Sequence, residues 1–345
     1  MKKVRLDMNK DAVNIYDIAK MSGVSIATVS RVMNGSEKVS EKTRKKVMDV
    51  IDKVGYTPNV FAQGLGLNTM HTIGVLVPTI ADPYMASAVG YLETELIKHG
   101  YDCILGNTGF DIEGKQKKTE MLLSKHIDSL ILVGSTYAGD GSDTNVTEYI
   151  REAAKRVPVF IINGNVNGEN IYASVCEDEK AVYEAATSML RRGRENIIFL
   201  TDSHSYSANK KKNGYERAMK SVGKNSKNGI IYVENQIHSV RDQLLAMDEL
   251  KCDGIIASND MIAIGAVKYA LAKGMEIPKE IEIIGYNNST IAMSCTPEVT
   301  SIDNHTEEIC KDTVDRIMKI LDSGEDKLTH KISVPCTLIS RETTL

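Results

Sequence analysis

From residue 72 onward, short apolar runs alternate with stretches whose apolar residues recur at helical spacing. The runs predict strands at 73–77, 103–105, 130–133, 159–162, 197–200, 229–233, 254–256 and 281–284. The stretches between them predict helices near 84–99, 113–125, 146–156, 178–192, 212–222, 239–250 and 261–273. Strands that are apolar on both faces are typical of parallel sheets covered by helices on both sides. The pattern predicts two doubly wound α/β subdomains, with a ligand cleft at the carboxyl ends of the strands.

Residues 14–57 follow a different pattern of short helical segments. Asn14 can cap a first helix, and Gly23 ends it. A second helix is predicted over 26–33, and Ser40 can cap a third helix that Gly55 ends. A glycine in the turn before the second helix fits a helix-turn-helix. The pattern by itself fits a generic three-helix bundle equally well.

Composition narrows the class of protein. The chain has 345 residues, of which 42% are apolar and 26% charged, as in globular proteins of about two domains. No apolar run approaches the ~18 residues of a membrane span, and the first residues lack the apolar stretch of a signal peptide. The six cysteines show no CxxC pair. They are expected to be reduced thiols in a cytoplasmic protein, with no structural zinc.

Charge is unevenly distributed along the chain. Residues 1–57 carry 12 Lys and Arg against 7 Asp and Glu, whereas the remainder carries 30 against 39. A basic head on an acidic body suggests that only the head meets a polyanion such as DNA. The excess of positive charge in residues 1–57 is modest, so a chance distribution of charged residues could also produce it.

The residues of the head carry a specific resemblance. They read IYDIA at 15–19, GVSIATVSRVMN at 23–34, VSEKTR at 39–44 and GYTPN at 55–59. This sequence strongly resembles the headpiece of the lactose-repressor (LacI/GalR) family of transcription regulators. The resemblance implies an all-α helix-turn-helix headpiece over 14–57.

The family resemblance also implies how the head would contact DNA. Ile26 and Ala27 stand where the family reads bases, and here they can only touch a thymine methyl group. Arg31 would supply hydrogen bonds, most naturally to a guanine. The remaining candidates would mainly contact phosphates, and they are Tyr16, Ser25, Thr28, Ser30, Asn34, Ser40, Thr43 and Tyr56. For Thr28 and Ser30, ordinary polarity of a helix surface is the alternative.

Residues 58–70 correspond to the family's hinge, where a leucine enters the minor groove and kinks the operator. Leu65 takes that position, and Asn59 and Ala62 match the same segment. Gly64 and Gly66 depart from the pattern, and each disfavours a helix interior by ~1 kcal/mol relative to Ala. We therefore expect a hinge that becomes ordered only when two copies pair on DNA.

The core, residues 71–345, is similar to the family's periplasmic-binding-protein type I-like core through HGY at 99–101, GN at 106–107 and IGY at 284–286. The family topology implies an N-subdomain of 71–163 and 300–322. It implies a C-subdomain of 164–299 and 323–345.

Residues that match the family's effector-contact positions follow predicted strands. They are Asp82, Tyr84, Phe110, Asn163, Lys211, Asp260 and Asn287. Two of these positions carry Asn where the family often has Asp, and Lys211 falls where the family often has an arginine. A less negative cleft with a lysine favours, weakly, a sugar acid or phosphosugar over a neutral sugar. The alternatives are that 210–212 is a solvated surface run, that Asp260 only caps a helix, and that Tyr84 and Phe110 only pack.

No catalytic pattern accompanies these residues. The seven histidines show no metal-binding spacing, and GxSxG is missing. We expect a homodimeric, cytoplasmic transcription regulator without catalytic activity or cofactor, which binds a palindromic operator and a small carbohydrate or sugar acid. The alternative is a solute-binding protein without DNA function.

Overall fold

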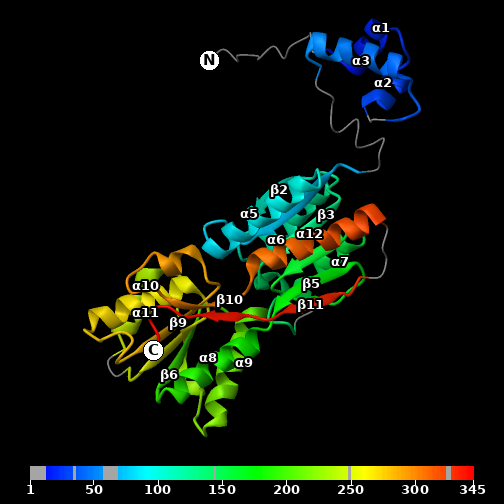
Figure 1. Ribbon diagram of the computed structural model, residues 1–345. Helices are drawn as coiled ribbons and strands as arrows, with labels where there is room; N and C mark the ends of the chain where they lie inside the picture. Colours follow the sequence, from blue (N-terminus) through cyan, green and yellow to red (C-terminus); the bar gives the residue numbers. More distant parts are fainter. Residues whose placement is uncertain (1–12, 34–35, 57–68, 143–144, 248–249, 324–327) are drawn as a thin grey trace, which may run out of the picture. The chain divides into compact units, whose positions relative to one another are not determined.

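The computed structural model of the chain divides into two compact units, Met1–His71 and Thr72–Leu345. It describes residues 13–33, 36–56, 69–142, 145–247, 250–323 and 328–345 (Figure 1). Most of the predicted hinge, 58–68, lies outside the described residues. Within the described part of the chain, no helix is long and apolar enough to cross a membrane.

The first unit contains the predicted helices α1 (Ile15–Ser22), α2 (Ile26–Met33) and α3 (Glu41–Val54). The Asn14 side chain accepts hydrogen bonds from the first turn of α1, and the Asp17 side chain accepts one from the Asn14 backbone. Such a capping box satisfies amide groups that the start of a helix leaves unpaired. Gly23 and Gly55 end α1 and α3 in the left-handed conformation, at φ of 61° and 64°.

A small apolar core holds these helices together. Ile18 from α1, Val29 from α2 and Val47 from α3 are fully buried, and Val32 and Ile51 pack beside them. Burying one such side chain contributes ~1.5–3 kcal/mol. The three helices therefore form a packed domain of their own.

The second unit begins with a sheet in the order β11-β5-β4-β3-β1-β2, all pairs parallel. Its strands are β1 (Thr72–Val77), β2 (Asp102–Asn107), β3 (Ser129–Val133), β4 (Val159–Ile162), β5 (Ile171–Cys176) and β11 (Lys331–Val334). Its helices are α5 (Pro83–Lys98), α6 (Ile112–Leu123), α7 (Glu148–Ala154) and α12 (Thr306–Ser323). Together they form the N-subdomain.

A second sheet has the equivalent order, β12-β10-β9-β8-β6-β7. Its strands are β6 (Ile197–Thr201), β7 (Ile230–Tyr232), β8 (Gly254–Ala257), β9 (Glu282–Tyr286), β10 (Thr300–Asp303) and β12 (Thr337–Ile339), of which β12 runs antiparallel to β10. Its helices are α8 (Asp178–Arg191), α9 (Tyr206–Ser221), α10 (Ile237–Leu245) and α11 (Asp260–Ala272). The C-subdomain therefore repeats the plan of the N-subdomain.

Each sheet is covered on both faces, as the apolar runs predict. In the N-subdomain, Val75 packs with α5 and α12, whereas its neighbour Leu76 packs with α6 and α7. In the C-subdomain, Ile255 packs with α10 and α11, whereas Ile256 packs with α8 and α9. Successive side chains of a strand point to opposite faces, so an unbroken apolar run fills two cores.

The expected subdomain boundaries are wrong. Residues 171–176 were assigned to the C-subdomain, but they form β5, which pairs with β4 of the N-subdomain. Residues 300–303 were assigned to the N-subdomain, but they form β10, which pairs with β9 of the C-subdomain. The described chain passes between the sheets in three short crossover segments, at 176–178, 303–306 and 334–337. The strands beside these segments were not predicted from the sequence, and α9 begins six residues earlier than expected.

The contact between α8 and α9 depends on Gly214. A Cβ atom added there would lie 2.2 Å from the backbone oxygen of Glu179, whereas one added at Gly90 of α5 would meet nothing within 4 Å. We expect Gly214→Ala to reduce the free energy of unfolding by ~1–3 kcal/mol through overpacking. The matched change Gly90→Ala should instead raise it by ~0.5–1 kcal/mol. Thermal unfolding of the two variants tests this, and equal midpoints would contradict the packing argument.

Candidate functional site

The helix α2 exposes one face of the head. Its Val29 and Val32 are buried, while Ser25, Ile26, Ala27 and Arg31 lie on the exposed side. Ile26 is 41% exposed although it is apolar, which is unfavourable in water and suits a contact with a thymine methyl group. In the described part of the chain, the Arg31 side chain makes no hydrogen bond or ion pair, so its guanidinium group is available to a ligand.

Matching Ser–Thr pairs begin α2 and α3. The Ser25 hydroxyl lies 2.9 Å from that of Thr28 and accepts from the Thr28 amide at 3.1 Å. Ser40 and Thr43 repeat this arrangement, with hydroxyls 2.9 Å apart. Their first role is therefore helix capping. The start of a helix presents amide groups and a positive dipole end that favour phosphate.

The other predicted DNA contacts differ in exposure. Tyr16 is 67% exposed at the start of α1, whereas Ser30 and Tyr56 are half-buried. Asn34, Asn59, Ala62 and Leu65 lie outside the described residues.

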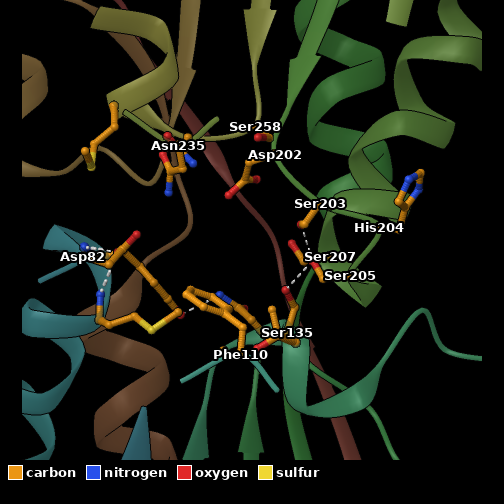
Figure 2. A pocket seen from close by; sticks show the side chains of 18 of the residues that line it. Asp82, Phe110, Ser135, Asp202, Ser203, His204, Ser205, Ser207, Asn235 and Ser258 are labelled. Carbon is orange, nitrogen blue, oxygen red and sulfur yellow. Dashed lines mark hydrogen bonds between the residues drawn. The ribbon is translucent and has the colours of Figure 1, made fainter. Parts of the chain in front are cut away.

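A cavity of about 1050 Å³ lies between the subdomains of the core. Its walls are the segments that follow β1, β2, β3 and β4 on one side and β6, β7, β8 and β9 on the other. Figure 2 shows Asp82, Phe110 and Ser135 on one wall and Asp202 and Asn235 on the other. Ligands of parallel α/β sheets bind at these carboxyl ends, where the helices on either side diverge.

The cavity brings together six of the seven residues expected to contact an effector. They are Asp82, Tyr84, Phe110, Asn163, Lys211 and Asn287. The Tyr84 hydroxyl accepts a hydrogen bond from the Asn163 amide at 2.5 Å, so this tyrosine is held in place within the wall. Phe110 is 63% exposed and presents an apolar ring.

The two asparagines occupy equivalent points of the two subdomains. Asn163 directly follows β4 and Asn287 directly follows β9, with φ of 62° and 95°. Asparagine tolerates positive φ better than most residues, because its short side chain can hydrogen-bond locally. The positive φ therefore favours asparagine at both positions, whether or not its side chain contacts a ligand.

Asp260 does not line the cavity, so its expected role is wrong. Its carboxylate accepts hydrogen bonds from the Ser289 amide and hydroxyl at 2.7 and 2.6 Å, and from the Ser301 hydroxyl at 2.6 Å. These contacts turn it toward the interior, where it joins α11 to the segment after β9. Its neighbours Asn259 and Met261 line the cavity instead.

Lys211 lines the cavity, but its ammonium group is already engaged. It donates to the Ser258 carbonyl at 2.9 Å and lies 3.5 Å from the centre of the Tyr286 ring. The interpretation of 210–212 as a surface run is wrong for Lys211, which is buried.

The cavity is more acidic than expected. Besides Asp82, it is lined by Asp140, Asp202 and Glu234, against the lysines Lys115 and Lys211. Desolvation raises the pKa of both Asp82 and Asp202, and the charge of Asp202 raises the pKa of Asp82 further. This lining does not favour the acidic effector that the lysine and the two asparagines suggested. Asp202 directly follows β6, a position at which a carboxylate could have been noticed in the sequence.

Two further features of the cavity escaped the sequence. The Ser135 hydroxyl of the N-subdomain donates to the Ser205 hydroxyl of the C-subdomain at 2.8 Å, which joins the two walls (Figure 2). Among the described residues, the side-chain oxygen (Oδ1) of Asn235 is buried in the cavity wall without a hydrogen-bond partner. An unpaired buried oxygen is costly unless a ligand or water pairs with it.

A helix-turn-helix unit joined to a two-subdomain core with a cavity between the subdomains defines the architecture of a ligand-binding transcription regulator. Residues 14–59 match the family model of bacterial regulatory proteins of the lacI family, and residues 186–344 match that of the periplasmic binding protein-like domain. The chain is 42% identical over 340 residues to an HTH-type transcriptional regulator of Lachnoclostridium phytofermentans, which covers 96% of this chain and 99% of the relative. The chain belongs to the lacI family of bacterial transcription regulators.

Solved structures agree with this fold. The lac repressor dimer bound to operator and the anti-inducer ONPF matches with a TM-score of 0.87 at 22% identity, over 97% of this chain and 100% of that chain. A complex of the transcriptional regulator CelR with cellobiose matches with a TM-score of 0.68 at 22% identity, over 96% of this chain and 99% of that chain. The predicted fold class, a helical headpiece followed by two doubly wound subdomains, is confirmed.

The buried Asp260 and the cavity residue Asp202 should respond oppositely to neutralisation. Asp260→Asn replaces an accepting oxygen with an amide group that faces donors, so the free energy of unfolding should fall by ~1–3 kcal/mol. Because burial raises the folded-state pKa of Asp202, charging this group costs stability as the pH rises above the unfolded-state value. Asp202→Asn should therefore raise stability near neutral pH, with a gain that shrinks toward pH ~4. Urea unfolding at several pH values tests both, and a gain independent of pH would contradict the assignment.

Proposed function

We propose that this lacI-family protein is a cytoplasmic, homodimeric repressor whose affinity for a palindromic operator is controlled by a small neutral carbohydrate. The observation that carries the proposal is the cavity between two subdomains of the same chain that bears the DNA-binding head. A ligand that binds both walls changes how far the subdomains close, and this difference in affinity between states is what shifts an equilibrium.

The proposed DNA contacts rest on the exposed face of α2. The free guanidinium group of Arg31 can donate two parallel hydrogen bonds to guanine, which no other exposed side chain of this helix can do. Ile26 and Ala27 add apolar contacts, and the starts of α2 and α3 supply phosphate contacts.

The choice of a neutral carbohydrate rests on the lining of the cavity. Asp202 and the unpaired oxygen of Asn235 are acceptors for hydroxyl groups, and Phe110 offers a ring on which the apolar face of a sugar can stack. An anionic ligand would meet the carboxylates of Asp82, Asp202 and Glu234. Lys211 offers limited compensation, because the Ser258 carbonyl and the Tyr286 ring already hold its ammonium group.

The proposed dimer rests on an apolar surface of the N-subdomain. Leu105 lies on the edge strand β2 and is 41% exposed, and Ile97 at the end of α5 is 58% exposed. Ile112, at the start of α6, is also exposed beside this edge. Exposed apolar side chains on an unpaired sheet edge favour association. Two copies related by a two-fold axis would present two heads to a palindromic site.

Selection of binding sites from random duplex DNA by the full-length protein tests the DNA-binding function. We expect a palindrome of two half-sites about one helical turn apart. Arg31→Lys keeps the charge but loses the paired hydrogen bonds, so it should weaken binding to the selected site by ~1–3 kcal/mol and relax one base position in each half-site. Lys53→Ala, at the far end of α3, is the control and should preserve base discrimination. Enrichment of no sequence by the wild type would favour a solute-binding protein without DNA function.

Thermal unfolding of the full-length protein with a panel of sugars tests the ligand class. Glucose, cellobiose and other neutral sugars are compared with gluconate, glucuronate and glucose 6-phosphate. We expect a neutral sugar to raise the midpoint, since a ligand at 100 times its Kd stabilises by ~2.7 kcal/mol. Asn235→Ala should weaken that sugar's binding by ~1–3 kcal/mol, because a buried acceptor is lost. The control Asn228→Ala lies on the exposed surface. Stabilisation by the anionic sugars alone would contradict the neutral class.

A further inference from the structure

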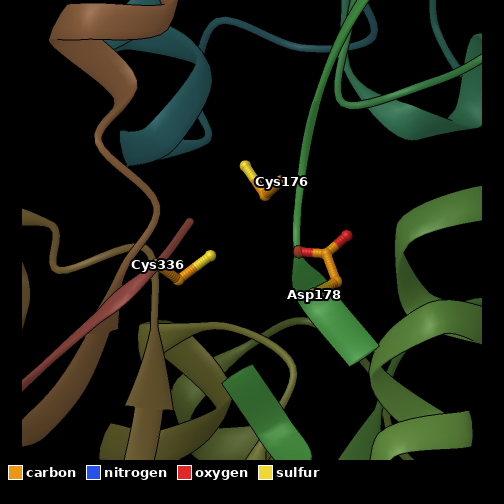
Figure 3. Close-up of side chains that lie close together, drawn as sticks. All are labelled: Cys176, Asp178 and Cys336. Carbon is orange, nitrogen blue, oxygen red and sulfur yellow. The ribbon is translucent and has the colours of Figure 1, made fainter. Parts of the chain in front are cut away.

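Two cysteines and an aspartate meet where the chain crosses between the subdomains. Cys176 ends β5 and Asp178 begins α8 on the first crossover segment, and Cys336 lies on the third segment between β11 and β12 (Figure 3). The two sulfur atoms and a carboxylate oxygen lie within 4.8 Å of one another, and both cysteines are free thiols. A disulfide between them requires the sulfurs to approach to ~2.05 Å.

The two thiols have different surroundings. Cys176 is buried, and its thiol donates to the Asn163 side-chain oxygen at 3.1 Å. Cys336 is partly exposed, and its sulfur lies 3.3 Å from the Tyr286 hydroxyl. Cys336 is the more exposed residue of the two, so an oxidant would meet it before Cys176.

These surroundings make Cys336 the more acidic thiol of the pair. The pKa of Cys336 is lowered because the Cys176 thiol, once it turns away from Asn163, can donate its proton to the Cys336 thiolate. Elsewhere in the described core, burial raises the pKa of Cys103 and Cys252 to about 11. A thiolate is the reactive form of cysteine, and a partner thiol nearby is the usual arrangement of redox-active pairs.

Metal binding suits this cluster less well. Both oxygens of Asp178 already accept hydrogen bonds, from the Ser207 hydroxyl at 2.7 Å and the Tyr286 hydroxyl at 2.5 Å. The ammonium group of Lys211 lies over the Tyr286 ring and supplies positive charge at the same place. A divalent cation would have to displace these contacts and meet that charge.

We propose that Cys176 and Cys336 form a reversible oxidation site that a peroxide converts to a disulfide between two crossover segments. The Cys336 thiolate attacks one peroxide oxygen, and the O–O bond breaks, leaving a sulfenic acid and hydroxide, which takes up the thiol proton to become water. The Cys176 sulfur then attacks the sulfenic sulfur, the S–O bond breaks, and a second water leaves with the Cys176 proton. Two thiols are oxidised by two electrons, and one peroxide is reduced to two waters.

The disulfide would act on the cavity through Asn163. Oxidation removes the thiol donor from the Asn163 oxygen, while the same side chain holds the Tyr84 hydroxyl in the cavity wall. It also ties the first crossover segment to the third, which restricts subdomain closure. This consequence rests on the proposed function, whereas formation of the disulfide does not.

Peptide mass analysis of the full-length protein after treatment with hydrogen peroxide tests the site. We expect a linked pair of peptides containing Cys176 and Cys336, lighter by the mass of two hydrogens and separated by dithiothreitol. Before oxidation, Cys336 should react with iodoacetamide at least ~10-fold faster than the buried Cys310, because alkylation follows thiolate fraction and exposure. Cys336→Ser should abolish the linked peptides, and the control Cys310→Ser should retain them.

Each outcome decides the question, and the wild-type result does not depend on whether a variant folds. Sulfinic acid at Cys336 without linkage, or linkage spread over other cysteines, would overturn the proposal. Binding of one equivalent of zinc that blocks alkylation of both thiols would overturn it in favour of a metal site. Linkage without any change in the sugar-dependent midpoint would keep the oxidation site and remove its proposed effect on the cavity.

Discussion

The buried carboxylate of Asp178 is the constraint on which the geometry of the core depends. A charged group in the interior is tolerated only when it is hydrogen-bonded, and Asp178 is bonded to Ser207 at the start of α9 and to Tyr286 at the end of β9. Both partners belong to the C-subdomain. Two residues earlier, Cys176 is bonded to Asn163 of the N-subdomain. The first crossover segment is therefore fixed to one subdomain at each end, and any change in closure must be absorbed within it.

The same contacts connect this segment to the ligand cavity. Asn163, Ser207 and Lys211 line the cavity, and each also touches a residue of the crossover region or the Tyr286 ring that packs there. A ligand that draws the walls together therefore acts on the groups that hold the crossover segment. Closure of the cavity and the conformation of the crossover segments are therefore coupled.

The sequence predicted local structure well, because local signals determine it. Asn14, Gly23, Ser40 and Gly55 set the ends of the head helices, and the structure places them at those caps. Six cavity residues were expected from the family resemblance, and two of them, Asn163 and Asn287, directly follow strands at the edge of a sheet where ligands bind.

The remaining features depend on contacts between distant residues. The pairing of β5 with β4 and of β10 with β9 decides where the subdomains end, and neither strand was predicted. Asp260 lies three residues after β8, yet the serines at 289 and 301 turn it inward. The acidity of the cavity likewise comes from segments after β3, β6 and β7 that only the folded chain assembles.

The central claim is that occupancy of the cavity changes the affinity of the head for DNA. The most direct test is the affinity of the full-length protein for its selected operator, measured with and without the neutral sugar that most raises the unfolding midpoint. The account predicts a change of ~5–150-fold, the usual range for coupled sites. Equal affinities at a sugar concentration that saturates the cavity would contradict it.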